Sequence, residues 1–307
     1  MTELVLSQGG IPIATLRTPS ALDALRAQWP EDRLVILKLD VTKREDINAA
    51  LEYVRAKVGR IDVVFNNAGY GLMGEVEGTP EDAARALFEV NFWGAAYVAR
   101  EAVKFFRDVN QPQGGTLLNV SSYMGLVPQP LMGYYVASKH GKHSPHGVEL
   151  SQVNTNSPCC SPRRSHGSVL SRIGSCMEHQ GESLIFPCNS RNIELIRMPQ
   201  VSLLEFGGFH TAATNSVVVV PAHASYTNSA LPSVFMRKFA SEWEAQGDPD
   251  KAVKFIYDFV NGTDQFPIRL AVGLDAIGMI KEKVKVLHDD LENAEKAHKD
   301  VVLTRTR

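Results

Sequence analysis

The chain has 307 residues, of which 44% are hydrophobic and 21% are charged, and its formal net charge is −2. These values describe one or two globular domains, and the near-neutral charge argues against a nucleic acid as partner. No apolar run approaches the roughly 18 residues that a membrane-spanning helix needs, and the opening residues lack the features of a signal peptide, so a cytoplasmic location is expected.

The first 65 residues alternate between helix and strand patterns. Residues 2–10 have the pattern of the last turns of a helix with a glycine stop, and Thr18 with Pro19 opens a helix that ends before Pro30. The expected strands cover residues 11–17, 34–39 and 61–65, and a further helix covers residues 42–59. Alternation of this kind predicts a parallel sheet with helices on both faces.

The alternation continues through the middle of the chain. Residues 79–80 open a long amphipathic helix that contains Asn91, and residues 117–120 form a buried strand that runs into a polar loop. A helix carrying Tyr135 and Lys139 follows.

The same pattern returns in the last third of the chain. Residues 201–205 predict a strand, residues 248–260 a helix, and residues 269–273 a last strand. A charged closing helix is expected over residues 275–299.

The pattern breaks between about residues 144 and 199. Gly141 and then Ser144-Pro145 interrupt the preceding helix, because proline disfavours helix in the residue before it. The segment that follows is rich in serine, proline, arginine and cysteine, holds all four cysteines, and shows no sustained strand or helix face. We expect it to be an irregular, disordered insert, and we interpret it as read-through of non-coding sequence such as an unspliced intron.

Tyr135 and Lys139 are the most informative pair in the chain, because residues four apart share one face of a helix. A lysine ammonium beside a phenol favours the phenolate and makes the phenol a usable proton donor and acceptor. Lowering a phenol pKa from about 10 towards 7 requires roughly 4 kcal/mol. One charge at about 5 Å and an effective dielectric near 20 supplies roughly 3 kcal/mol. A pair of solvated helix residues is the alternative interpretation.

Three polar elements precede this pair: Asn66-Asn67-Ala68-Gly69 after a strand, Asn91 in the long helix, and Ser122 after residues 117–120. Together with Tyr135 and Lys139, their order and spacing resemble the Asn-Asn-Ala-Gly, Asn, Ser and Tyr-x-x-x-Lys elements of the short-chain dehydrogenase/reductase family.

The resemblance covers roughly residues 11–143 and 201–298. It includes Phe206-Gly207-Gly208-Phe209-His210-Thr211, which is similar to the family's Pro-Gly-Gly-Phe-x-Thr turn with Phe206 in place of the proline.

The resemblance implies a catalytic set of Asn91, Ser122, Tyr135 and Lys139. Tyr135 would transfer the proton, and Lys139 would lower its pKa and hold the nicotinamide ribose. Ser122 would hydrogen-bond the substrate oxygen, and Asn91 would support a proton-relay water.

The resemblance also implies a nicotinamide cofactor. The residues expected to contact it are Arg17, Asp40, Val41, Asn67, Ala68, Gly69, Tyr135, Lys139, Gly207 and Thr211. Arg17 suits a 2′-phosphate, because guanidinium forms bidentate pairs with phosphate oxygens, and this favours NADP with NAD as the alternative. The competing interpretations are an ordinary surface residue for Arg17, a helix cap for Asp40, and a simple turn for residues 66–69.

The family's first strand and its Thr-Gly-x-x-x-Gly-x-Gly turn have no counterpart here, so the first strand of this chain corresponds to the family's second. We interpret this as an N-terminal truncation. Losing five or six apolar side chains from mid-sheet would remove about 10 kcal/mol of burial.

The sequence therefore predicts an α/β fold: a single Rossmann-like domain over residues 1–307, with a doubly wound parallel sheet in a three-layer αβα arrangement that lacks the first strand and glycine-rich loop. Residues 144–199 form the insert and residues 212–240 the substrate loop. Large apolar residues in that loop suggest a hydrophobic alcohol or carbonyl substrate, and the run Val217–Val220 is either a wall of that loop or a buried connector.

The predicted activity is NAD(P)-dependent interconversion of an alcohol and a carbonyl, with Tyr135 as general acid/base. The alternatives are an inert truncated or mis-spliced chain without a pyrophosphate loop, and a dinucleotide-binding regulator without turnover. The resemblance further allows a homo-oligomer through the helices with Asn91 and Tyr135. No metal site is expected, because the spacings of His140, His143 and His146 and of the cysteines match no compact zinc knuckle.

Overall fold

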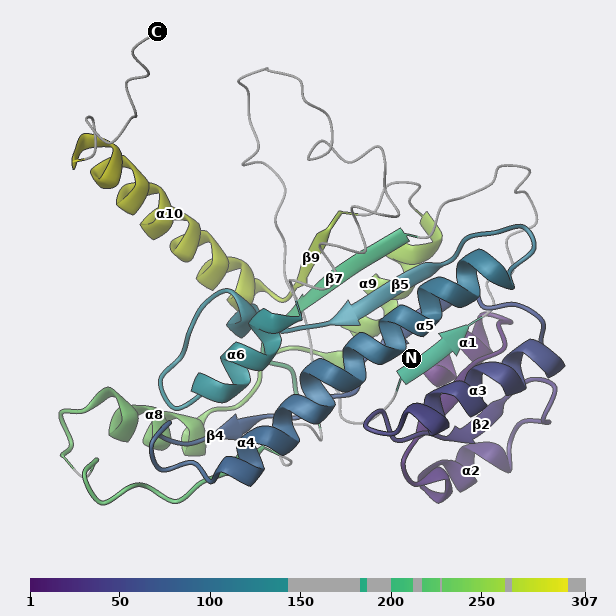
Figure 1. Cartoon of the computed structure of the whole chain (residues 1–307), viewed down its shortest axis with the longest axis horizontal. Coiled ribbons are helices and arrows are strands. Elements are labelled where there is room, and N and C mark those ends of the chain that lie inside the picture. Colours follow the sequence, from purple (N-terminus) through teal and green to yellow (C-terminus); the bar gives the residue numbers. More distant parts are fainter. Residues whose placement is uncertain (143–182, 187–199, 212–216, 227, 263–266, 298–307) are drawn as a thin grey trace, which may run out of the picture.

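The computed structural model describes residues 1–142, 183–186, 200–211, 217–226, 228–262 and 267–297 (Figure 1). The strands are β1 (Ile13–Leu16), β2 (Val35–Lys38), β3 (Val63–Asn66), β4 (Leu72–Met73), β5 (Thr116–Val120), β6 (Ser183–Phe186), β7 (Gln200–Phe206), β8 (Val218–Val219) and β9 (Arg269–Val272). The α-helices are α1 (Thr2–Ser7), α2 (Asp23–Arg26), α3 (Arg44–Lys57), α4 (Glu81–Phe88), α5 (Ala95–Asp108), α6 (Gly133–Gly141), α8 (Pro232–Glu242), α9 (Pro249–Gly262) and α10 (Leu274–Ala297). Two 3₁₀ segments, η1 (Pro19–Leu22) and η3 (Tyr123–Gly125), and one π-helix, η2 (Glu89–Gly94), complete the set.

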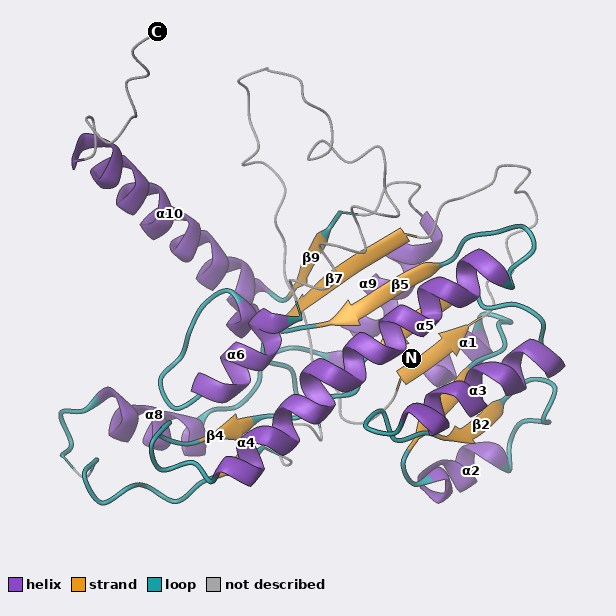
Figure 2. Cartoon of the chain, viewed as in Figure 1, coloured by secondary structure: helices purple, strands orange, loops and turns teal. Residues whose placement is uncertain are grey.

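A seven-stranded sheet in the order β2-β1-β6-β3-β5-β7-β9 forms the centre of the fold. β1 pairs in parallel with β2, and β3, β5, β7 and β9 pair in parallel in succession. Helices lie on both faces of this sheet, so the predicted doubly wound, three-layer α/β architecture is confirmed (Figure 2).

A strand from the expected insert occupies the middle of the sheet. β6 runs antiparallel to both of its neighbours, with Ile185 opposite Ile13 of β1 and Val64 of β3. The expectation that residues 144–199 contain no strand is therefore wrong for residues 183–186, and the sheet is mixed. Without β6, β1 and β3 would each present unpaired N–H and C=O groups mid-sheet, and the short apolar run of residues 184–186 is long enough to pair with both. The rest of the insert, including its four cysteines, lies outside the described residues.

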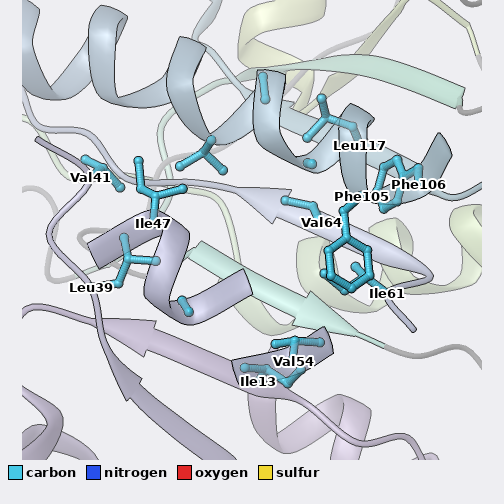
Figure 3. Packing of buried hydrophobic residues seen from close by; sticks show 14 of the residues in the cluster. Ile13, Leu39, Val41, Ile47, Val54, Ile61, Val64, Phe105, Phe106 and Leu117 are labelled. Atoms are coloured by element: carbon cyan, nitrogen blue, oxygen red, sulfur yellow. The ribbon is translucent and has the colours of Figure 1, made fainter. Parts of the chain in front are cut away.

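Two apolar layers hold the sheet between its helices. On one face, buried side chains of β1, β3 and β5 pack against α3 and α5; Figure 3 shows Ile13, Val64 and Leu117 beside helical residues that include Ile47 and Phe105. On the other face, α1 and α9 contribute Val5, Ala252 and Ile256 to a second cluster. β1 and β3 are buried at every position, as expected for strands covered on both sides.

Most predicted elements are present, with ends within two residues of those expected. The long helix that begins after Pro80 is continuous as α4, η2 and α5, and its π-helical middle was not anticipated. Across the part of the chain that the structure describes, no helix combines the length and apolar character that crossing a membrane requires.

A second, two-stranded sheet lies in the region expected to bind substrate. β4 and β8 pair in parallel, with Leu72 opposite Val218 and Met73 opposite Val219, and α8 follows β8. Val218 and Val219 are exposed and Val220 is buried, so the valine run is neither wholly an exposed wall nor wholly a buried connector.

Candidate functional site

α6 brings the Tyr135 ring and the Lys139 ammonium together. Lys139 Nζ lies 5.5 Å from the centroid of the Tyr135 ring, and the two residues are 2% and 1% exposed. Tyr135 Oη is buried and has no hydrogen-bond partner among the described residues. A buried hydroxyl without a partner is costly in a folded protein, and a bound molecule is one way to satisfy it.

The surroundings of Tyr135 are apolar. Leu72, Leu87 and Val220 form a buried cluster with it. Partly buried side chains pack against this cluster: Tyr70, Met124, Met132 and Tyr134. These contacts bring β4, α4 and the segment after β8 to the Tyr135 side of α6.

Asn91 fixes the loop after β3 to α6. Its Oδ1 accepts a hydrogen bond from Tyr70 N at 3.0 Å, and its Nδ2 donates to Tyr70 O at 2.9 Å and to Ser138 Oγ at 3.2 Å. Ser138 Oγ in turn donates to Tyr135 O at 2.7 Å. Asn91 lies in the π-helix η2, a local widening of the helix that is frequent at functional sites. It therefore positions both the loop and α6, a role that its predicted function did not include.

Gly69 lies directly beside Lys139. A Cβ placed on Gly69 would be 3.4 Å from Lys139 Nζ and 3.0 Å from Asn91 Oδ1. The end of the Asn-Asn-Ala-Gly loop thus meets two members of the predicted catalytic set, and only glycine leaves this space open.

The rest of this loop is buried. Asn67 and Ala68 are 3% and 6% exposed. Asn66 Nδ2 donates to Asn119 Oδ1 and to Ala95 O, each at 2.8 Å, which ties the ends of β3 and β5 to the start of α5.

Ser122 lies at the end of β5, where it caps η3. Its Oγ accepts a hydrogen bond from Met124 N at 3.2 Å and donates to Phe206 O at 3.3 Å. η3 packs against α6, with His140 Nδ1 2.7 Å from Gly125 O. Ser122 therefore joins the turn after β7 to the segment that supports Tyr135.

The predicted adenosine contacts gather at the carboxyl ends of β1 and β2. Asp40 Oδ1 accepts hydrogen bonds from Thr42 N at 3.0 Å and Thr42 Oγ1 at 2.8 Å. Burial alone would raise the pKa of Asp40, but these hydrogen bonds and the charges of Arg17 and Lys43 outweigh it and lower the pKa. Arg17 also acts electrostatically on Tyr70, so its guanidinium lies near the loop after β3. Asp40 forms a turn with Thr42 before α3, and the N-cap of α3 is Lys43, so Asp40 is not the helix cap that was the alternative.

Val41 packs under the long helix. A Cβ on Gly94 would be 2.7 Å from Val41 Cγ2 and 2.9 Å from Val41 O, so the helix approaches this loop as closely as a glycine permits. Val41 itself is buried.

The turn after β7 faces the start of α10. Gly208 N donates to Asp275 Oδ2 at 2.7 Å, and Asp275 occupies the space where a Gly207 side chain would lie. Thr211, half-buried, is the last residue described before residue 217. Gly207 follows Phe206, whose carbonyl accepts from Ser122, so this turn adjoins the Ser122 side of the site.

The residues present fit two ends of a dinucleotide. Gly69, Lys139 and Tyr135 Oη, which has no hydrogen-bond partner among the described residues, are the groups that a nicotinamide ribose would contact, and Arg17 lies near Asp40 and Tyr70 on the side expected to contact the adenosine. Between them, β6 runs opposite to its neighbours, so no strand among the described residues ends there in a glycine-rich turn. A pyrophosphate cradle of the family's type is not among the described residues.

Two features near the site were not predicted from the sequence. Lys142 is 1% exposed, and its Nζ donates to Val120 O at 3.0 Å. Burial, followed by repulsion from Lys139, lowers its pKa well below the ordinary value. The one signal in the sequence was its position three residues after Lys139, at the C-terminal end of α6.

The second unpredicted feature is an ion pair between Glu75, after β4, and Arg237 of α8. Arg237 Nη2 lies 2.5 Å from Glu75 Oε2, and Arg237 Nη1 donates to Val220 O at 2.8 Å. The pair fastens the segment after β8 to β4, and Val220 in turn contacts Tyr135. No sequence pattern links residues 162 positions apart.

Comparisons with known proteins point to one family. Residues 1–145 match the family model described as short chain dehydrogenase. The curated "Uncharacterized oxidoreductase C162.03" of Schizosaccharomyces pombe is 26% identical over 294 residues, which cover 95% of this chain and 84% of that protein. These matches place residues 1–145 in the short-chain dehydrogenase/reductase family.

Solved structures show the same fold. A short-chain dehydrogenase from Streptomyces avermitilis has a TM-score of 0.74 at 24% identity, with 98% of this chain and 92% of that chain covered. A short-chain dehydrogenase/reductase from Burkholderia phymatum, solved in complex with NAD, has a TM-score of 0.58 at 20% identity, covering 90% and 81%. The predicted family and the prediction of an oxidoreductase enzyme are confirmed.

Proposed function

We propose that the chain catalyses reversible hydride transfer between NADP and a hydrophobic alcohol or carbonyl, with Tyr135 as general acid/base. The observation that carries this proposal is the buried Tyr135 hydroxyl, which lacks a partner among the described residues and has Lys139 Nζ 5.5 Å from its ring. Such a phenol can donate its proton to the carbonyl oxygen of a substrate that binds in these apolar surroundings.

Each neighbouring residue has a defined part. Lys139 places positive charge beside the phenol, which favours loss of its proton when an alcohol is oxidised. Ser122 Oγ, held by Met124 N and Phe206 O, can turn its hydrogen towards the reacting oxygen. Asn91 keeps Tyr70 and Ser138 in place and so fixes the distance between Gly69 and α6. The nicotinamide supplies the hydride when it is bound.

The proposed preference for NADP rests on Arg17. Its exposed guanidinium lies near Asp40 and Tyr70 at the carboxyl end of β1, where a 2′-phosphate would reach. Guanidinium pairs with phosphate oxygens in a bidentate fashion, whereas a 2′-hydroxyl is better bound by a carboxylate that is free of other bonds. Asp40 already bonds Thr42, so NAD remains the weaker cofactor in this proposal.

The proposed substrate is apolar around its reacting carbon. Leu72, Leu87 and Val220 surround Tyr135 with side chains that cannot hydrogen-bond a polar substrate. The expected cytoplasmic location and the predicted oligomer through the helices of Asn91 and Tyr135 stay predictions.

A second candidate is a chain of this family that binds no cofactor and is inert; it is favoured because the described residues contain no pyrophosphate cradle of the family's type. Titration of the purified protein with NADPH, followed by nicotinamide fluorescence, separates the two. Saturable enhancement, together with NADPH oxidation that depends on an added apolar ketone, supports the enzyme. Lys139→Met should raise the dissociation constant for NADPH at least about tenfold, because the ammonium beside Gly69 is lost. If the fluorescence does not saturate up to millimolar NADPH, the result supports the second candidate, the inert chain.

A further inference from the structure

Lys142 connects the helix of Tyr135 to the strand that leads to Ser122. It is the C-cap of α6 and keeps helical backbone angles, with φ −59° and ψ −22°. Tyr135, Lys139 and Lys142 follow one another at intervals of four and three residues, so they share one face of the helix. Lys142 is 1% exposed, and its Nζ donates a hydrogen bond to Val120 O, at the end of β5, at 3.0 Å.

The acceptor of this hydrogen bond lies beyond the point where β3 leaves the sheet. β3 pairs with β5 only up to Asn119, so Val120 has no residue of β3 opposite it. On the other side of β5, Ser121 N donates to Leu204 O of β7 at 2.7 Å. Successive residues of a strand direct their backbone groups to opposite neighbours, so Val120 O faces the side that β3 has left. Lys142 supplies a donor at that position.

A second contact ties the same segment to α6 on the other side of Ser122. η3, which follows β5, packs against α6 (Figure 1), and His140 Nδ1 lies 2.7 Å from Gly125 O. Ser122 lies between the two contacts, two residues after Val120 and three residues before Gly125. The two contacts together therefore fix where Ser122 lies relative to Tyr135.

The burial of Lys142 opposes folding. Burial, followed by repulsion from Lys139, lowers the pKa of Lys142 well below its ordinary value. Lys142 therefore reduces stability at any pH below the unfolded pKa of about 10.4, where the unfolded chain carries the charge. Methionine has a similar length and would fill the same space without this cost. What the amine adds is the hydrogen bond to Val120 O, so its contribution is to geometry.

We propose that Lys142 is a positioning residue, whose hydrogen bond to Val120 O holds the end of β5 so that Ser122 keeps its place beside Tyr135. This inference rests on the proposed function, in which the hydroxyls of Ser122 and Tyr135 act on the same substrate oxygen. A displacement of about 1 Å between groups that act on one atom can lower a rate up to about a hundredfold. Lys142 acts through Ser122 and contacts neither substrate nor cofactor.

The first test follows amide hydrogen exchange of the full chain and needs no turnover. Lys142→Met should speed exchange at Ser121 N about five- to tenfold, the factor expected for one lost hydrogen bond, because the end of β5 is held less firmly. The urea midpoint near neutral pH should not fall, because the variant also removes the buried amine. The control variant Lys57→Met, which removes an exposed lysine at the end of α3, should change neither quantity.

The second test measures turnover with NADPH and an apolar ketone. Lys142→Met should lower kcat about tenfold and leave the dissociation constant for NADPH within about twofold of the wild-type value. In the Ser122→Ala background the same change should lower kcat by less than about twofold, because the hydroxyl that Lys142 positions is already absent.

The outcomes separate this inference from the proposed function. Unchanged exchange at Ser121 in Lys142→Met would overturn the positioning role, and so would a wild-type kcat in that variant. Effects of Ser122→Ala and Lys142→Met on kcat that multiply would show that Lys142 does not act through Ser122. A wild type without NADPH-dependent turnover would overturn the proposed function and, with it, the role of Lys142 in catalysis.

Discussion

Replacing Arg237 by methionine should release the segment after β8 from the site. The guanidinium and the Glu75 carboxylate are 19% and 5% exposed, so removing Arg237 leaves a buried carboxylate without its main partner. It also leaves Val220 O without the donor that lies 2.8 Å away. Breaking a buried pair from one side costs about 3–5 kcal/mol, and the partial exposure of Arg237 favours about 3 kcal/mol.

Two measurements follow from this value. If residues 217–243 open locally, a cost of about 3 kcal/mol raises the open population roughly 150-fold, which appears as faster limited proteolysis and a higher KM for an apolar ketone. The dissociation constant for NADPH should not change, because the cofactor residues lie elsewhere. Lys238→Met, one residue further along α8 and exposed, is the matched control.

The pH dependence of this pair has a defined sign. Burial would raise the pKa of Glu75, but hydrogen bonds from Arg237 and from the backbone outweigh it, so the folded pKa is lowered. The stabilisation is therefore complete above the unfolded pKa of about 4.3 and is lost as the pH falls through the lower folded value. The difference in the free energy of unfolding between wild type and Glu75→Gln should shrink over that acidic window.

Unchanged proteolysis and KM in Arg237→Met would refute the predicted role of this ion pair. Additive effects of Glu75→Gln and Arg237→Met on stability in a double-mutant cycle would refute it as well.

Three further predictions concern single residues of the site. Gly69→Ala should lower kcat/KM about tenfold or more, because its Cβ would lie 3.0 Å from Asn91 Oδ1 and 3.4 Å from Lys139 Nζ. The control variant Gly278→Ala, whose Cβ would meet nothing within 4 Å, should leave kcat/KM unchanged. Lys142→Met should flatten the pH dependence of the free energy of unfolding, measured with urea. Because burial lowers the folded pKa of Lys142, the wild type should gain stability as the pH rises from that folded pKa towards the unfolded value of about 10.4. A wild-type slope that persists in the variant would exclude Lys142 as its source. Arg17→Glu should reverse the preference between NADPH and NADH in steady-state assays, and an unchanged ratio would remove Arg17 from cofactor recognition.

The sequence was sufficient for the elements whose burial pattern is local. β1, β3 and β5 are short apolar runs that end in polar loops, and the spacing of Tyr135 and Lys139 fixes their relation on α6 without reference to the rest of the fold. Asn91 and Gly69 belong to recognisable motifs, so their place in the site was predictable even though their contacts were not.

The remaining features depend on pairing between distant segments. β6 is a four-residue run within a polar insert, and only the vacant position between β1 and β3 makes it a strand. Glu75 and Arg237 carry no local pattern, and their pairing follows from the docking of β8 on β4. Periodicity cannot reveal such contacts, because tertiary packing decides them.

The most direct test of the proposed chemistry is the turnover of Tyr135→Phe at saturating NADPH and ketone. The phenylalanine keeps the ring between Leu72 and Val220 and removes only the hydroxyl that has no partner among the described residues. We predict a loss of about 10²–10⁴ in kcat with NADPH binding unchanged, as expected for removal of a general acid. A variant that retains the wild-type kcat would contradict the assignment of Tyr135 as the proton donor.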